Sequence, residues 1–309
     1  MSTLLNRLRV ERSGDYEHAI KPVEIESVVS ANGFMLEKPL HGVFAKSKDR
    51  AIHLHGDNYQ LIPYEKILSG LSDSLDDYGV DLEGASIHFD VAGSLSRMKL
   101  RVMFGMDTEL GSHIMQYDPN DRLQFGIEIV SSYDASVIFK LQTMFLRLIC
   151  ANGMKSFEKI NSSLRKHTLE FDINESFKKL KGLNSSFKNL ADRFETYQSV
   201  ALTRNEVDRL FKSFSKGSAG KEYLLNNILE KQDNLTLWDT YNALTNYSEH
   251  NRRAVPIGKR KSKEFDVRNS SMDKIRSNDK RTAEVQEFIQ SNTFLFFAHQ
   301  GVSNQLRSN

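Results

Sequence analysis

Apolar residues occupy every second position over much of the first half of the chain, a pattern typical of strands that bury one face. The segments that read as strands, each bounded by Gly, Pro, Asp or Asn, are 24–29, 42–47, 51–56 and 123–130. A hairpin is predicted over residues 85–105, with Arg97, Lys99 and Arg101 on the polar face of its second strand.

Residues 134–150 follow the last of these strands and predict a long amphipathic helix. Its apolar stripe, at the spacing of 3.6 residues per turn, comprises Val137, Ile138, Leu141, Met144, Phe145, Leu148 and Ile149. Ser131 or Ser132 is placed to cap the start, and Asn152-Gly153 is placed to cap the end.

Helical spacing also appears at residues 64–78 and throughout the region after residue 171. A heptad seam is formed by Leu183, Phe187, Leu190, Phe194, Tyr197 and Ala201. This seam is explained either by an intramolecular helical hairpin or by pairing between subunits. Further helices are predicted at 204–214, 221–231 and 237–250, the last opened by a capping box from Thr236 to Asp239.

These elements predict an α+β fold in which an antiparallel sheet packs on the long central helix. A mainly helical C-terminal subdomain then follows. The expected divisions are a flexible N-terminus (1–23), an α+β core domain (24–170), a helical subdomain (171–250), a basic linker (251–281) and a Phe-rich C-terminal helix or tail (282–309).

Composition narrows the class of protein. The chain has 309 residues, of which 39% are hydrophobic and 27% charged, as in globular proteins. It contains no apolar run of the roughly 20 residues needed to span a bilayer, and its first residues lack a secretory signal pattern. The single cysteine, Cys150, excludes an internal disulfide and a multi-cysteine zinc site. We therefore expect a cytoplasmic protein with no membrane contact.

Charge is distributed unevenly along the chain. Residues 1–134 hold 13 Lys/Arg against 21 Asp/Glu, whereas residues 135–216 hold 15 against 8. The basic linker, 251–281, holds 11 Lys/Arg against 4 Asp/Glu. Such asymmetry favours a polyanionic partner, although two surfaces of opposite sign can also meet each other or a second subunit.

No motif for catalysis is present. The sequence lacks a phosphate-binding loop, a dinucleotide fingerprint, a nucleophile elbow, a zinc-protease helix and a calcium loop. His53 and His55 share a strand face near Asp57, but spacing fixes no third metal ligand, so packing is the expected role. We expect a non-enzymatic protein with no catalytic residues, no metal and no cofactor.

Basic residues instead suggest binding to nucleic acid, because phosphates need a track of cations and unpaired bases need aromatic faces. Candidate aromatic faces are Tyr117, Tyr133 and Phe157, while Trp238 is expected to be buried. The candidate nucleic-acid-binding residues are Arg97, Lys99, Arg101, Lys140, Arg147, Lys155, Lys159, Arg165, Lys166, Lys259, Arg260, Lys261 and Lys263.

Several blocks in order resemble a phage- and plasmid-borne family called domain of unknown function 932. The blocks are HLHGDNYQLIPY, the AGSL hairpin, FLRLICANGM with its Cys150-x-Asn152 pattern, LRKHT and LWDTYNALTNYSEH. The resemblance implies an accessory protein of a mobile element, located in the bacterial host cytoplasm, with no catalytic residues to transfer. Strands followed by a long helix also resemble, at the level of fold alone, the Rad52-like single-strand annealing proteins.

Together these features predict a phage-encoded accessory protein that binds single-stranded DNA in replication, recombination by annealing, or transcription, and that can form a homo-oligomer. The alternative is a protein-interaction module that inhibits or redirects a host machine. In that case the Phe-rich segment, with Phe288 and Phe294 to Phe297, would dock on a host or phage protein.

Overall fold

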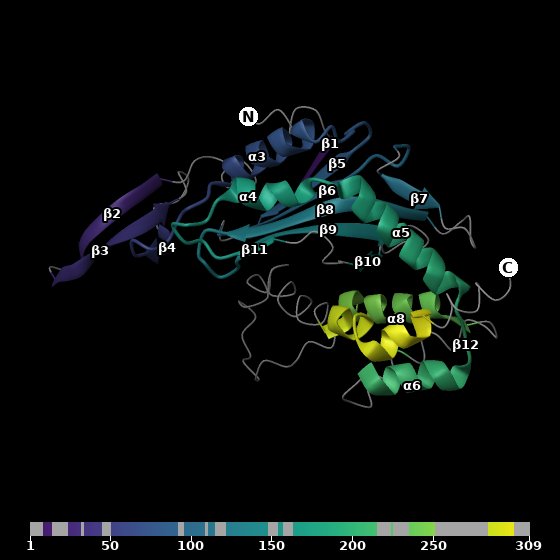
Figure 1. The fold of residues 1–309 in the computed structure, drawn as a ribbon. Coiled ribbons are helices and arrows are strands. Elements are labelled where there is room, and N and C mark those ends of the chain that lie inside the picture. The colour runs from purple at the N-terminus through teal and green to yellow at the C-terminus, as the bar shows by residue number, and fades with distance from the viewer. Residues whose placement is uncertain are drawn as a thin grey trace.

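The computed structural model describes most of the chain between residues 9 and 299. The described residues are 9–13, 24–31, 34–44, 51–91, 96–108, 111–114, 122–147, 154–156, 163–214, 224, 235–250 and 284–299. Within these ranges the fold is α+β, as the sequence predicts (Figure 1).

The strands are β1 (Arg9–Ser13), β2 (Glu24–Ala31), β3 (Phe34–Phe44), β4 (Ala51–His55), β5 (Ser86–Val91), β6 (Arg97–Met103), β7 (Ser112–Ile114), β8 (Arg122–Ser132), β9 (Phe139–Arg147), β10 (Met154–Ser156), β11 (Ser163–Arg165), β12 (Ala201–Leu202) and β13 (Leu235–Thr236). The helices are α3 (Tyr64–Asp77), α4 (Ile173–Phe177), the 3-10 turn η2 (Lys178–Leu180), α5 (Leu183–Ser199), α6 (Arg204–Phe214) and α8 (Leu237–His250). Residues 284–289 and 292–299 are also helical.

The main sheet has eight strands in the described ranges, with the order β1-β5-β6-β8-β9-β10. β7 pairs with β8, and β11 pairs with β9 at the other end from β10. Every pairing is antiparallel except that of β1 with β5, which is parallel. A separate three-stranded sheet, β2-β3-β4, extends to one side (Figure 1).

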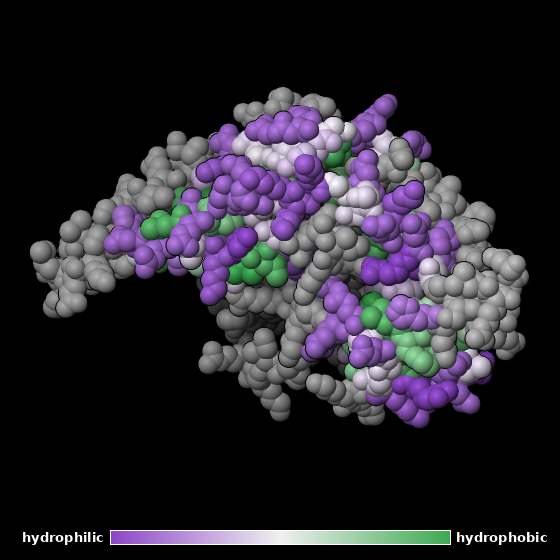
Figure 2. Space-filling model, viewed as in Figure 1, coloured by the Kyte–Doolittle hydropathy of each residue, from purple (hydrophilic) through white to green (hydrophobic). Residues whose placement is uncertain are grey.

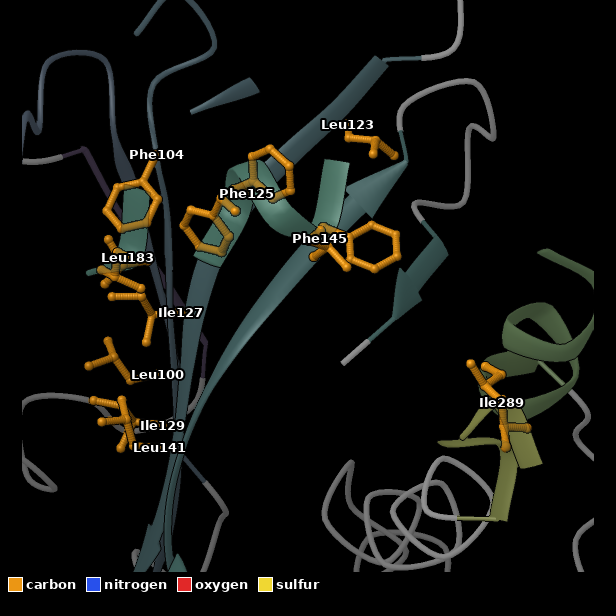
Figure 3. Packing of buried hydrophobic residues seen from close by; sticks show 14 of the residues in the cluster. Leu100, Phe104, Leu123, Phe125, Ile127, Ile129, Leu141, Phe145, Leu183 and Ile289 are labelled. Carbon is orange, nitrogen blue, oxygen red and sulfur yellow. The ribbon is translucent and has the colours of Figure 1, made fainter. Parts of the chain in front are cut away.

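One face of the main sheet is apolar because the strands alternate. Leu100, Ile127 and Ile129 project from the same side (Figure 3), and all three are at most 1% exposed. The helices α3, α4 and α5 cover this face (Figure 1). The rings of Phe125 and Phe187 are stacked with centroids 4.6 Å apart, which fixes the first half of α5 on the sheet.

The second half of α5 lies between the sheet and the helical layer, and the ring of Phe194 is 4.7 Å from that of Phe145 in β9. Phe194 packs on Trp238 and Tyr241 of α8, with ring centroids 4.8 and 5.2 Å apart. The seam residues from Leu183 to Tyr197 are almost fully buried, so this seam packs inside one chain. Trp238 is 3% exposed, which confirms the expected burial.

The segment predicted as the long central helix is instead strand β9, and that prediction is wrong. Residues 140–147 pair with β8 over eight positions, from Leu123↔Arg147 to Val130↔Lys140. The same residues also alternate, with Phe139 and Leu141 on the helix-covered face and Lys140 on the other. Residues 141–145 are buried on both faces, and the polar residues Gln142 and Thr143 are among them. The run therefore lacks the alternation of apolar and polar residues of a half-buried strand. Leu141, Met144 and Phe145, which point to different faces of the sheet, fall instead at helical spacing. Ser132 caps no helix: its hydroxyl bonds the main chain of Val137 and closes the turn between β8 and β9.

Residues 9–13, within the segment expected to be a flexible N-terminus, form β1 at the edge of the main sheet. The sheet, α4, α5 and α8 share one hydrophobic cluster, which thus includes residues on both sides of the expected division at 170/171. Other predictions are confirmed, among them α3, the β5–β6 hairpin and α6. The capping box is also present: the Asp239 amide donates to Thr236 Oγ1 at 3.2 Å, and the Thr236 amide donates to Asp239 Oδ2 at 2.9 Å.

The Phe-rich C-terminal segment lies against the helical layer. Phe288 packs on Phe214 of α6 with ring centroids 5.2 Å apart, and Phe294 packs on Tyr197 of α5 at 5.6 Å. Phe294 is fully buried, whereas Phe296 is 56% exposed. None of the helices in the described ranges is long and apolar enough to cross a membrane.

Candidate nucleic-acid interface

Two of the predicted phosphate-binding cations lie in a charge cluster on the second face of the main sheet. Glu128 of β8 accepts from Lys99 Nζ at 2.9 Å and from Arg101 Nε at 3.0 Å, both through Oε2. Gln142 Nε2 donates to the other carboxylate oxygen at 3.1 Å. The cluster follows from register, since Arg101 lies opposite Glu128 and Glu128 lies opposite Gln142.

Within this cluster the carboxylate of Glu128 neutralises the charges of Lys99 and Arg101. Glu128 is 2% exposed, and burial alone would raise the pKa of its carboxyl. Lys99 and Arg101 outweigh burial and hold the pKa of Glu128 below its usual range. The carboxylate is therefore charged at neutral pH, and it occupies donors that a phosphate would otherwise need.

Arg97 lies at the end of the same strand and binds the turn between β8 and β9. Its Nε donates to Ser136 Oγ at 2.6 Å and lies 3.7 Å from Asp134 Oδ2. Burial opposes ionisation of Asp134, but hydrogen bonds from Ser136 and Ser96 and the charge of Arg97 hold its pKa below the usual range. Ala135, between them, has a φ of 52°, so Arg97 helps to hold a strained turn.

The second pair of predicted cations, Arg165 and Lys166, has a different environment. Both side chains are exposed, and they follow Leu164, which is 47% exposed, in the edge strand β11. Neither side chain has an ion-pair partner among the residues that the structure describes. A hydrogen bond of 2.9 Å between Ser163 Oγ and Ser176 Oγ ties this edge to α4. Arg165 and Lys166 are thus the candidate cations best placed to meet a phosphate.

Beside these cations, six rings form a continuous row that we call the ring ladder. Its members, in spatial order, are His41, His55, Tyr59, His167, Phe171 and Phe139. Neighbouring centroids in this order lie 5.5, 4.6, 5.6, 6.1 and 5.3 Å apart. The ladder connects the three-stranded sheet with the core of the main sheet.

Tyr59 and His167 hold the middle of the ladder in place. Their rings are stacked with only 8° between their planes. The Tyr59 hydroxyl donates to the Tyr133 carbonyl at 3.0 Å, and the Gln60 amide donates to the His167 carbonyl at 3.1 Å. Burial lowers the pKa of His167 to about 4, so this ring is neutral at neutral pH.

The rings at the His41 end of the ladder are partly exposed, whereas Phe139 at the other end is fully buried. The His41 side chain is 31% exposed, and its Nε2 lies 3.1 Å from Asp57 Oδ1. His53 is on the same strand as His55, with centroids 6.0 Å apart, and burial lowers its pKa. In the described part of the chain, no group of three or more His, Cys, Asp or Glu side chains is arranged to hold a metal ion.

The structure describes only some of the other predicted residues. Lys140 lies on the second sheet face between Val130 and Leu164. Tyr133 is fully buried and stacked on Tyr64 with centroids 3.9 Å apart, so it is wrong as a base platform. The candidates that lie outside the described residues, or whose side chains do, are Arg147, Lys155, Lys159, Lys259, Arg260, Lys261, Lys263, Tyr117 and Phe157.

The described residues thus define an α+β protein that carries a cationic strand edge beside a ladder of rings. The family model described as Domain of unknown function (DUF932) matches residues 51–290, and the chain belongs to this family. No curated protein matches the chain. No solved structure matches it either, so the resemblance to Rad52-like proteins has no structural counterpart.

Proposed function

We propose that this chain is a single-stranded DNA-binding accessory protein of a phage, acting in replication, recombination by annealing, or transcription. The observation that carries the proposal is the exposed pair Arg165 and Lys166 on an open strand edge, next to partly exposed rings. Single strands require both features, because cations hold the phosphates and flat rings hold the bases. The resemblance to mobile-element proteins noted in the sequence is in keeping with this role.

The geometry narrows the predicted set of binding cations. Lys99 and Arg101 are neutralised by Glu128, and Arg97 is bound to the turn at Asp134. We assign these three residues to the fold and keep Arg165 and Lys166 as the phosphate contacts. Exposed Lys179 of η2, Lys181 in the turn after it and Lys188 of α5 extend the basic surface.

The proposal is tested by fluorescence-anisotropy titration of labelled single-stranded DNA, duplex DNA and RNA across a salt series. We expect salt-steep binding to single strands. The double variant R165E/K166E should weaken it by at least about tenfold and reduce the salt slope by roughly 1.4, or about 0.7 for each lost phosphate contact. Arg209→Glu, at an exposed position on α6, is the matched control and should bind as the wild type does. Absence of binding by the wild type at about 50 mM salt would sink the proposal.

A further inference from the structure

Strand β11 is an edge of the main sheet that presents an apolar residue and two cations to its surroundings. It pairs with β9 on one side, and no strand in the described ranges pairs with it on the other. Leu164 is 47% exposed, and Arg165 and Lys166, which follow it, are exposed as well. Figure 2 shows hydrophobic surface at the position of β11, bordered by hydrophilic residues. An open edge that exposes a large apolar residue is suited to pairing with a strand of another chain.

Strand β2 is the open edge of the other sheet. In the described ranges it pairs only with β3, and its three-stranded sheet extends away from the main sheet (Figure 1). Residues 24–28 pair with residues 40–44 without interruption, so this part of β2 is a regular strand. β2 contains Glu24 and Glu26 but no Lys or Pro, the residues that commonly block an open edge. The chain thus carries two open strand edges of opposite charge.

One register between these two edges matches apolar and charged residues at the same time. When Leu164 lies opposite Ile25, two apolar residues become neighbours on one face of the pair. Alternation then places Arg165 on the other face, opposite Glu24 in an antiparallel pair or Glu26 in a parallel pair. The two edges are therefore complementary in both charge and apolar pattern, whichever way the strands run.

We propose that β2 of one copy of this chain adds to β11 of a second copy, so that their sheets become continuous across the contact. A second copy is the partner because the chain itself carries both complementary edges. The two edges differ, so the contact is head-to-tail, leaves one edge of each kind free and can repeat from copy to copy. Arg165 and Lys166 are also the proposed phosphate contacts, so β2 and a phosphate exclude each other at any one copy. The inference does not rest on the proposed function, because assembly is measured without nucleic acid.

The test is sedimentation velocity of the wild type and of charge-reversed proteins over a range of concentrations. The wild type should associate as its concentration rises and dissociate as salt rises. E24K/E26K and R165E/K166E should each weaken self-association by at least about tenfold, because each variant places like charges on the facing strands. An equimolar mixture of the two variants should associate again, because the unchanged β2 of one meets the unchanged β11 of the other. The control, Glu83→Lys with Arg209→Glu, reverses exposed charges outside both strands and should associate as the wild type does.

Two results would overturn the inference. One is a wild type that stays monomeric at about 100 μM. The other is a mixture that stays monomeric while both variants keep the circular dichroism spectrum of the wild type. If a variant does not fold, hydrogen exchange of the wild type decides the question instead. Amides of residues 24–28 and 163–165 should then gain protection between dilute and concentrated samples, and unchanged protection of both strands in an associated sample would overturn the contact.

Discussion

Glu128 Oε2 lies 2.9 Å from Lys99 Nζ, with both side chains on the second face of the main sheet. Arg101 Nε reaches the same oxygen at 3.0 Å. One buried carboxylate therefore satisfies two cations that the sequence presents as a phosphate-binding stripe. Polar residues on an alternating strand have two explanations, solvent or an internal partner, and here the partner is 27 residues further along the chain.

Removing the carboxylate should destabilise the fold. Glu128→Gln leaves Lys99 and Arg101 without their counter-charge, and breaking a buried pair costs about 3–5 kcal/mol. We expect a loss of this size in the free energy of unfolding measured with urea. Glu170→Gln, at an exposed position, is the control and should change this free energy by no more than about 0.5 kcal/mol. Equal urea midpoints for Glu128→Gln and Glu170→Gln would contradict a structural role for the Glu128 ion pairs.

His167 should make stability depend on pH. Its pKa falls from 6.5 to about 4 on folding because the ring is buried. The folded state thus binds the proton more weakly than the unfolded state, so the stabilisation is complete above pH 6.5 and is lost as pH falls from 6.5 to about 4. The shift corresponds to roughly 3 kcal/mol. Urea unfolding at a series of pH values should show this loss in the wild type and a flatter profile in His167→Gln. If His167→Gln lost stability with falling pH as steeply as the wild type, a group other than His167 would be responsible for the loss.

Much of the architecture can be predicted from the local sequence pattern. The main error of that prediction, the helix expected at β9, has a definite physical cause. The strand β5 and the helices α3 and α5 have one buried face, so their periods of two and 3.6 residues are clear. Strand β9 is buried on both faces, which removes the alternation that would have identified it. Its pairing with β8 is a tertiary interaction, and such interactions override local preference.

Only the cationic part of the candidate site can be predicted from the sequence, because the ring ladder also depends on tertiary contacts. Arg165 and Lys166 stand together in the sequence, so a basic surface was expected there. The ring ladder joins residues that are far apart, and Tyr59 and His167 are separated by 108 positions. The bridge between Tyr59 and Thr168 and the hydrogen bond from the Gln60 amide to the His167 carbonyl bring them together, and no spacing rule in a single sequence predicts such long-range contacts.

The heptad seam of α5 gives a prediction about assembly. Phe194 is fully buried against Phe145, Trp238 and Tyr241 of the same chain. Phe194→Ala should therefore lower the free energy of unfolding by about 3–5 kcal/mol without changing the oligomeric state. Light scattering and urea unfolding measure the two effects separately, with Lys188→Ala as the exposed control on the same helix. A change in mass for Phe194→Ala but not for Lys188→Ala would instead favour subunit pairing through this seam.

The C-terminal segment decides whether the alternative function, docking on another protein, has a structural basis. Phe288 is 8% exposed and packs on Phe214 and Phe294, whereas Phe296 is 56% exposed. If the segment is integral to the fold, Phe288→Ala should lower the free energy of unfolding by about 3 kcal/mol, while Phe296→Ala should change it by no more than about 0.5 kcal/mol. Amides of residues 284–299 should then be protected from hydrogen exchange in the wild type and less so in Phe288→Ala. A docking tail that does not pack on its own chain would behave differently: both variants would leave stability unchanged, and these amides would exchange at the rate of an unfolded peptide. In that case packing in the helical layer could not explain the aromatic residues of the segment, and binding to a partner protein would be the better explanation.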